Sequence, residues 1–334
     1  MEAYRDAMLR FIAPALLLCA APAAPHDVAT PANADHHLPD DSAGDMALGE
    51  LANRMTVPVS INGSAPQPFV IDTGAERSVI SRQFALRLGL AAGPTVRLTT
   101  MTGQSNVPTV VIPSLDVGPV RDRRAFNAPA LEARHMGAHG LLGIEQLRRH
   151  MVAIDFKSGT ISLRPSRSAG GRQERRPGDT DEIVVTARSR LGQLIVTEAE
   201  FEGTRVTVVI DTGSQVSMGN LALQRKLRRI PLKGPIEMTS VTGEKLTVNY
   251  HVAERVRIGG VNLAGVPVAF ADIPPFEHFG LSNRPAVMLG MDALRGFRRV
   301  EIDFPDRKIR MLVSRNPSND VSVLSRSGQA SRLR

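Results

Sequence analysis

The tripeptide Asp-Thr-Gly occurs twice in this chain of 334 residues, each time directly after an apolar run. FVIDTGA places the first carboxylate at Asp72, and VVIDTGS places the second at Asp211. One such tripeptide is weak evidence, because ordinary turns at strand ends favour Asp, Thr and Gly. Two copies constrain the fold more strongly, since they predict two half-sites that bring their carboxylates to a common centre.

Three further segments recur in the same order around the two tripeptides. TTMTGQ and TSVTGEK place glycines at Gly103 and Gly243, and LLG and MLG place them at Gly143 and Gly290. AIDFKSGTISL and EIDFPDRKIRML then follow in the first and second halves. Corresponding positions lie 139 to 148 residues apart. Chance turns do not keep such a register, so the pattern indicates an internal duplication.

These segments resemble the retropepsin-like aspartic proteases, in particular the bacterial forms, and the resemblance covers residues 55–164 and 183–313. In that family an apolar-apolar-Asp-Thr-Gly-Ala/Ser turn carries the catalytic aspartate. A glycine-containing hairpin forms a flap, and an apolar-apolar-Gly segment supports the active-site loop. All three features occur twice here, so the resemblance implies two lobes of retroviral size fused in one chain.

The implied fold is all-β, with two retropepsin-like (acid protease) β-barrel lobes related by pseudo-two-fold symmetry, each with a short helix. Composition agrees, because short runs of Val, Ile, Leu and Thr alternate with Gly and Pro. The short helices are expected at QLRRH (146–150) and ALRGF (293–297). The expected organisation is a signal peptide (1–24), a disordered leader (25–47), an N-terminal lobe (48–164), a linker (165–182), a C-terminal lobe (183–314) and a disordered tail (315–334).

The chemistry of two adjacent carboxylates agrees with the resemblance. Two such groups cannot both ionise comfortably, so they share one proton and titrate as a pair. The ionised member would activate a water, while the protonated member donates a proton to the developing oxyanion of a peptide carbonyl. Asp72 and Asp211 are therefore the predicted catalytic pair of an aspartic endopeptidase. Its substrate is a polypeptide, and the reaction needs no cofactor, metal or covalent intermediate.

The resemblance also implies roles for the residues around the aspartates. In the family, the two threonines interlock across the halves, and the two glycines leave room for close approach to the carboxylates. The predicted support of the active-site loops consists of Thr73, Gly74, Ala75, Thr212, Gly213 and Ser214. The predicted flap and substrate-binding residues are Met101, Thr102, Gly103, Val241, Thr242 and Gly243.

The chain departs from the viral pattern after the apolar-apolar-Gly segment. Viral members continue with Arg-Asn, whereas this chain has Ile144-Glu145 and Met291-Asp292. Bacterial relatives commonly resemble this chain at these positions. The departure therefore favours a bacterial subtype.

The N-terminus predicts export to the periplasm or the exterior. Arg5 and Arg10 precede an apolar stretch at 11–21, and small residues after it offer an Ala-x-Ala cleavage site. The stretch is too short to span a bilayer in the ordinary way, so no integral membrane span is expected after cleavage. Cys19 leaves lipoprotein anchoring as an alternative, which Leu18 disfavours.

Three alternatives remain open at this stage. The chain is either a protease or a catalytically silent peptide-binding or regulatory protein that keeps the cleft. Its lobes pair within one chain, giving the expected monomer with an intramolecular pseudo-dimer, or with lobes of a second chain. The formal charge of +8 makes nucleic-acid binding the third alternative to consider. No recognised nucleic-acid-binding module accompanies the charge, so we expect a solvated basic surface and no nucleic-acid partner. Aromatic residues make up only 4%, which favours substrate subsites lined by aliphatic side chains.

Overall fold

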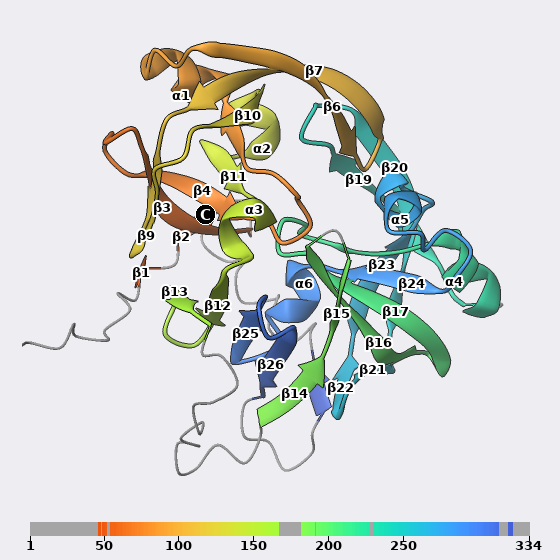
Figure 1. Cartoon of the computed structure of the whole chain (residues 1–334). Coiled ribbons are helices and arrows are strands. Elements are labelled where there is room, and N and C mark those ends of the chain that lie inside the picture. The colour runs from red at the N-terminus through yellow and green to blue at the C-terminus, as the bar shows by residue number, and fades with distance from the viewer. Residues whose placement is uncertain are drawn as a thin grey trace, which may run out of the picture. The chain divides into compact units, whose positions relative to one another are not determined.

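The computed structural model describes residues 46–47, 49–51, 54–166, 182–190, 192–227, 230–313 and 320–322. All of them belong to one compact unit of the chain, Ser42–Arg334. Strands account for most of these residues and the helices are short, so the prediction of an all-β fold is confirmed (Figure 1). The predicted signal peptide (1–24) lies outside the described residues, as do most of the predicted leader, linker and tail.

The N-terminal lobe (residues 49–147, the N-lobe) contains one sheet and three short helices in the described residues. Its elements are β2 (Gly49–Leu51), β3 (Arg54–Ile61), β4 (Gln67–Ile71), β5 (Val79–Ser81), α1 (Arg82–Arg87), β6 (Ala92–Thr100), β7 (Gly103–Ile112), β8 (Leu115–Val117), β9 (Val120–Asp122), β10 (Phe126–Leu131), α2 (Ala133–Met136), β11 (Gly140–Leu142) and α3 (Ile144–Leu147). The strand order is β6-β7-β10-β5-β11-β4-β3-β8-β9, and β2 pairs with β3.

The C-terminal lobe (residues 188–294, with β27, the C-lobe) repeats this arrangement. Its elements are β15 (Arg188–Arg190), β16 (Gln193–Phe201), β17 (Thr204–Ile210), β18 (Ser217–Gly219), α4 (Leu221–Leu227), β19 (Lys233–Thr239), β20 (Lys245–Ala253), β21 (Val256–Ile258), β22 (Val261–Ala264), β23 (Val266–Phe270), α5 (Pro274–His278), β24 (Ala286–Leu289), α6 (Met291–Leu294) and β27 (Asp320–Ser322). The strand order is β19-β20-β23-β18-β24-β17-β16-β21-β22-β27, and β15 pairs with β16.

A third sheet is built from strands of both halves. Its order is β1 (Met46–Ala47), β13 (Thr160–Pro165), β12 (His150–Asp155), β25 (Arg299–Asp303), β26 (Lys308–Leu312) and β14 (Glu182–Thr186). The two halves meet where β12 pairs antiparallel with β25, with Ala153 opposite Glu301 (Figure 1). The repeated AIDF and EIDF segments form these two central strands. The duplication in the sequence thus becomes the seam that joins the lobes.

Hydrophobic patterning explains why these segments form these strands. In β3, Met55, Val57, Val59 and Ile61 are all buried, which is the period of two expected of a strand with one face on the core. The strands before the two aspartates differ, because consecutive residues such as Phe69, Val70 and Ile71 are all buried. Both faces of these central strands are covered, so the turns that follow them rest on rigid supports.

Two details differ from the sequence expectation. The lobe sheets are open rather than closed barrels, because the order ends at separate edge strands, β6 and β9 in one lobe and β19 and β27 in the other. The edge strands β6 and β19 belong to the long hairpins predicted as flaps, and each pairs on one side only. Each lobe also carries three short helices in the described residues rather than one.

The predicted helices α3 and α6 are present but begin before the expected segments, at Ile144 and Met291. The preceding glycines, Gly143 and Gly290, have extended backbones at the N-cap positions. The domain boundaries stay a prediction. Within the predicted leader, Met46–Ala47 pairs with β13, and within the predicted tail, Asp320–Ser322 pairs with β22.

Candidate active site

The two Asp-Thr-Gly turns are held in matching ways at the ends of buried strands. Asp72 follows β4 and donates its backbone N–H to the carbonyl of Leu142 at 3.0 Å. Asp211 follows β17 and donates to the carbonyl of Leu289, also at 3.0 Å. Leu142 and Leu289 belong to the repeated LLG and MLG segments. These segments therefore support the turns that carry the carboxylates, as the resemblance implied.

Each carboxylate is oriented by its own turn. The Oδ1 atom of Asp72 accepts the backbone N–H groups of Gly74 and Ala75, both at 2.9 Å. The Oδ1 atom of Asp211 accepts those of Gly213 and Ser214, at 3.0 and 3.2 Å. Backbone donors of this kind fix the rotamer of a carboxylate without using another side chain.

The structure brings the two carboxylates together through the glycines. A Cβ atom on Gly74 would lie 2.6 Å from Oδ1 of Asp211. A Cβ atom on Gly213 would overlap the carboxylate of Asp72. The α-carbon of each turn therefore faces the carboxylate of the opposite lobe. Only glycine permits this approach, because any other residue would add the clashing atom.

Four hydrogen bonds between Thr73 and Thr212 and the opposite strands lock the lobes below the carboxylates. The Thr73 N–H donates to Oγ1 of Thr212, and the Thr212 N–H donates to Oγ1 of Thr73, both at 3.1 Å. The Thr73 hydroxyl donates to the carbonyl of Ile210 at 2.9 Å, and the Thr212 hydroxyl to that of Ile71 at 2.7 Å. Both threonines are buried, so the network satisfies polar groups that water does not reach.

A serine and a carboxyl group lie behind each turn, and the sequence analysis missed this role. In the N-lobe, Ser78 donates its N–H to Glu145 at 2.7 Å, while its hydroxyl accepts the N–H of Gly143. In the C-lobe, Ser217 donates both its N–H and its hydroxyl to Asp292, at 3.0 and 2.6 Å. Each serine lies six residues after its aspartate, and this repeated spacing is the signal that could have revealed the pairs.

The second residue of each pair that replaces the viral Arg-Asn, Glu145 or Asp292, is thus a partly buried acid that supports the loop. Ile144 and Glu145 donate their N–H groups to the carbonyls of Ala75 and Glu76, at 2.9 and 3.2 Å. Burial raises the pKa of Glu145 despite the hydrogen bond from Ser78. Burial likewise raises the pKa of Asp292 to about 6, against the lowering effect of its hydrogen bonds from Ser217.

The predicted flaps form two long hairpins that cross toward the opposite lobes. Flap 1 comprises β6 and β7 with Met101 and Thr102 at its tip, and flap 2 comprises β19 and β20 with residues 240–244 at its tip. The Thr102 hydroxyl of flap 1 donates to Glu244 of flap 2 at 3.3 Å. Gly103 and Gly243 both have positive φ angles, 151° and 101°, which glycine adopts without strain.

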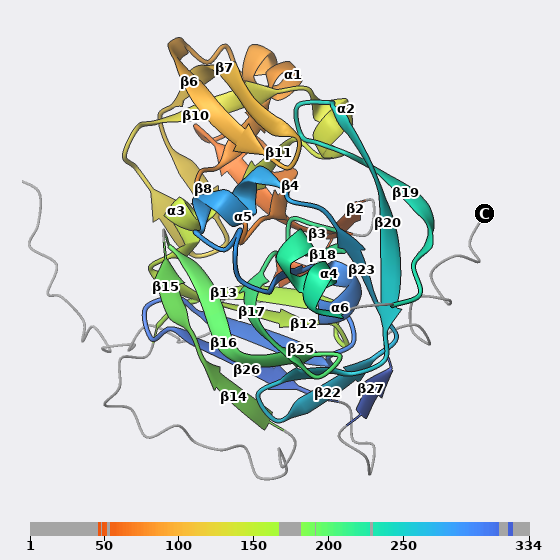
Figure 2. The ribbon, with the colours of Figure 1, turned by 90° about the vertical axis from the view of Figure 1, so that its right-hand side faces the viewer.

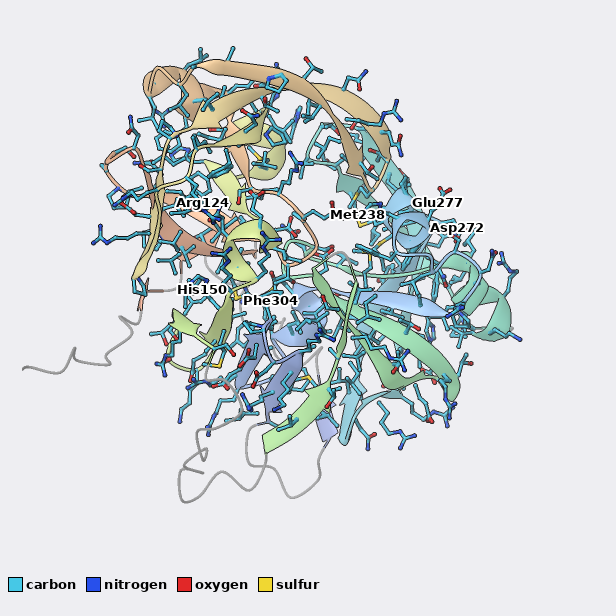
Figure 3. The ribbon with its side chains drawn as sticks, in the orientation of Figure 1. Arg124, His150, Met238, Asp272, Glu277 and Phe304 are labelled. Carbon is cyan, nitrogen blue, oxygen red and sulfur yellow. The ribbon has the colours of Figure 1, made fainter. Side chains whose placement is uncertain are left out.

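Each flap tip packs on the other lobe. Met101 of flap 1 packs against the C-lobe cluster that contains Phe276 and Phe279. Met238 of β19, labelled in Figure 3, packs against the same cluster. Val241 of flap 2 packs against the N-lobe cluster that contains Leu131 and Met136. Figure 2 shows the loop between β19 and β20 reaching α2 of the N-lobe. Each hairpin therefore reaches from its own lobe to the other lobe.

A contact between His278 and Glu76 joins the lobes beside the first turn. Nε2 of His278, at the end of α5, lies 2.7 Å from Oε1 of Glu76, four residues after Asp72. Both side chains are exposed. In the second lobe, Gln215 follows Ser214 at the position of Glu76, so the surroundings of the two turns are not identical.

No set of three or more His, Cys, Asp or Glu side chains within the described ranges could hold a metal ion. In the same part of the chain, no helix combines the length and apolar character needed to cross a membrane.

Two half-sites with the same hydrogen bonds define the class: a two-lobed, all-β protein of the retropepsin type. A family model described as aspartyl protease matches residues 57–145 and 197–293, one stretch in each lobe and together more than half of the chain. The chain therefore belongs to the aspartyl protease family. A comparison with curated proteins found no match.

Proposed function

We propose that this protein is an aspartic endopeptidase that hydrolyses peptide bonds with a water held between Asp72 and Asp211. The observation that supports this most directly is the approach of each turn to the opposite carboxylate, where Gly74 faces Asp211 and Gly213 faces Asp72. Two carboxyl groups in such proximity share a proton and supply a base and an acid at one centre.

In this mechanism the ionised carboxylate removes a proton from water as the water oxygen attacks the peptide carbonyl carbon. The protonated carboxyl donates its proton to the carbonyl oxygen, which gives a neutral tetrahedral diol. As the diol collapses and the C–N bond breaks, the carboxyl that took the water proton donates it to the amine nitrogen. The other carboxylate takes a proton from a diol hydroxyl, which becomes part of the product carboxyl group, so the pair returns to its starting state. The turns hold both carboxylates through backbone N–H groups, so little reorganisation accompanies the reaction.

The flaps suit an extended polypeptide substrate. Their tips meet between Thr102 and Glu244, and the contacts of Met101 and Val241 with the opposite lobes would be exchanged for contacts with the substrate. Closure of such hairpins excludes water and orients the peptide. Because both halves of the site come from one chain, we propose that the monomer is the active form.

Cleavage of a diverse peptide library between pH 4 and 7 tests this function. The wild-type protein is expected to cut peptides internally, and Asp72→Asn and Asp211→Asn are each expected to abolish cutting. Retention of peptides without cleavage by the wild type would instead favour a binding protein. Full activity in either variant would exclude the shared pair.

We further propose that the protein is exported, on the strength of the charged and apolar N-terminus. Cell fractionation and sequencing of the mature N-terminus test this. An intact N-terminus in a cytoplasmic fraction would contradict it.

A further inference from the structure

A cavity of about 180 Å³ lies in the N-lobe under the tip of flap 2. It is bounded by β7 of flap 1, the end of β10, α1, α2 and the loop of flap 2. Its walls therefore come from the N-lobe and from both flaps. Its polar lining consists of Arg82, Ser105, Glu132, His135, Thr242 and Glu244.

One ion pair in the lining is already satisfied within the N-lobe. Arg82 donates to Glu132 at 3.3 Å and, through Nε, to the carbonyl of Ala130 at 3.1 Å. The other oxygen of Glu132 accepts the amide of Gln83 at 2.7 Å. These two opposite charges therefore cancel, and neither one defines the preference of the cavity.

His135 presents an unsatisfied donor. Nε of Arg134 donates to Nε2 of His135 at 3.2 Å, so the neutral ring carries its hydrogen on Nδ1. That Nδ1 atom is buried and has no hydrogen-bond partner among the described residues. It lies beside the tip of flap 2, where a Cβ on Gly243 would come 2.8 Å from it. A buried donor without an acceptor costs free energy that a bound acceptor would recover.

Glu244, at the tip of flap 2, supplies a hydrogen-bond acceptor. Its carboxylate accepts the hydroxyls of Thr242 and Thr102, and the Thr242 hydrogen bond holds its pKa below the ordinary value. An ionised carboxylate has about four acceptor positions, so a further donor can bind. The tip of flap 2 covers the His135 donor in this structure, so the cavity offers this donor, beside the acceptor at Glu244, when the flap moves to admit a substrate.

We propose that this cavity is a substrate subsite that selects an uncharged carboxamide side chain, glutamine or asparagine. A carboxamide oxygen accepts from His135 while its NH₂ group donates to Glu244. An acidic side chain would meet the carboxylate of Glu244, and a basic side chain has no acceptor for the His135 donor. An aliphatic side chain would leave the His135 donor unsatisfied. This inference rests on the proposed peptidase function, because it assigns a position of that substrate.

The corresponding wall of the C-lobe is different. There the buried side chains are Phe276, Phe279 and Leu281, and Met238 and Leu246 pack against them. This side is apolar, and it contains two phenylalanines where the sequence favoured aliphatic side chains alone. We expect substrates with an apolar residue at one position and a carboxamide residue at another, so the two lobes recognise different parts of an extended peptide.

Positional peptide pools test the inference in two ways. Each pool fixes Gln, Glu, Lys or Leu at one position and randomises the others. Cleavage is measured with the wild type, and retention of uncut peptide is measured with Asp72→Asn. At one position, Gln is expected to be favoured about tenfold over the other three, as one recovered buried hydrogen bond allows.

Three variants identify the residues responsible. His135→Phe keeps a flat ring of similar size and is expected to abolish the Gln preference. Glu244→Lys, on the exposed flap tip, is expected to shift the preference from Gln to Glu. His278→Phe replaces a histidine on the matching helix of the C-lobe, outside the cavity, and is expected to leave the Gln preference intact.

The outcomes separate the two proposals. A Gln preference in retention without cleavage by the wild type would support the subsite and overturn the peptidase function. Cleavage with no position favouring Gln would overturn the subsite and leave the peptidase function standing. A Gln preference that survives His135→Phe unchanged would also overturn the assignment of this cavity.

Discussion

The carboxyl of Asp292 gives a stability prediction whose size follows from the structure. Its side chain is largely withdrawn from water behind the second turn, where it accepts hydrogen bonds from Ser217 and Ala293. Burial dominates and raises its pKa from 3.8 to about 6. The folded protein therefore binds this proton more tightly than the unfolded chain does, and stability falls as the pH rises.

The raised pKa contributes about 3 kcal/mol to the free energy of unfolding at low pH, since each unit of pKa difference between the folded and unfolded states corresponds to about 1.4 kcal/mol. The stabilisation is complete below the pKa of this carboxyl in the unfolded chain, near 4. It is lost as the pH rises through the pKa in the folded protein, about 6. Between pH 4.5 and 7.5 the change is about 2 kcal/mol. Asp292→Asn removes the titration, so the unfolding free energy of the wild type should fall by this amount relative to the variant.

Urea unfolding at several pH values, followed by far-ultraviolet circular dichroism, measures both free energies. Other titrating groups, including Asp72 and Asp211, contribute equally to both proteins and cancel in the difference. A hydrogen bond lost in the variant shifts the difference by a constant. Glu145→Gln in the N-lobe should show a trend of the same sign, because burial also raises the pKa of Glu145. A difference between the wild type and Asp292→Asn that does not change with pH would refute the reasoning.

Three further changes test the site. Gly213→Ala places a methyl group on the carboxylate of Asp72 and should abolish cleavage. Gly260→Ala, in the turn between β21 and β22 with no neighbour within 4 Å, should leave the cleavage rate unchanged; equal rates for the two variants would contradict the close approach. Thr212→Val leaves the N–H of Thr73 and the carbonyl of Ile71 without the Thr212 hydroxyl and should lower the free energy of unfolding by about 3 kcal/mol. A loss below about 1 kcal/mol in urea unfolding would argue against the interlock. Met101→Ser removes a half-buried contact of flap 1 and should raise KM about fivefold; an unchanged KM in steady-state kinetics would show that this contact does not help to close the flap.

The duplication could be predicted from the sequence because it preserves residue types at a nearly constant spacing. That spacing correctly paired the two Asp-Thr-Gly turns, the LLG and MLG segments and the central strands β12 and β25. The hydrogen bonds between Thr73 and Thr212 followed from the resemblance. Each of these features is repeated in both halves, so one copy supported the interpretation of the other.

Some contacts between the lobes join unlike segments and are not repeated in the other half, so the duplication did not predict them. His135 meets the tip of flap 2, and His278 meets Glu76. Neither pair has a counterpart at the repeat spacing, and each depends on how the lobes pack. The open sheets were missed for a related reason: the pattern of β6 and β19 shows that they are strands but does not show whether an edge is paired.

The central claim is that one site is formed by two aspartates of the same chain. The most direct test is to measure peptide cleavage by Asp72→Asn alone, by Asp211→Asn alone and by an equimolar mixture refolded together, beside the wild type. Our account predicts that only the wild type cuts, because every chain in the mixture lacks one member of its own pair. Activity in either single variant would contradict the shared pair, and activity restored in the mixture would show that lobes pair between chains.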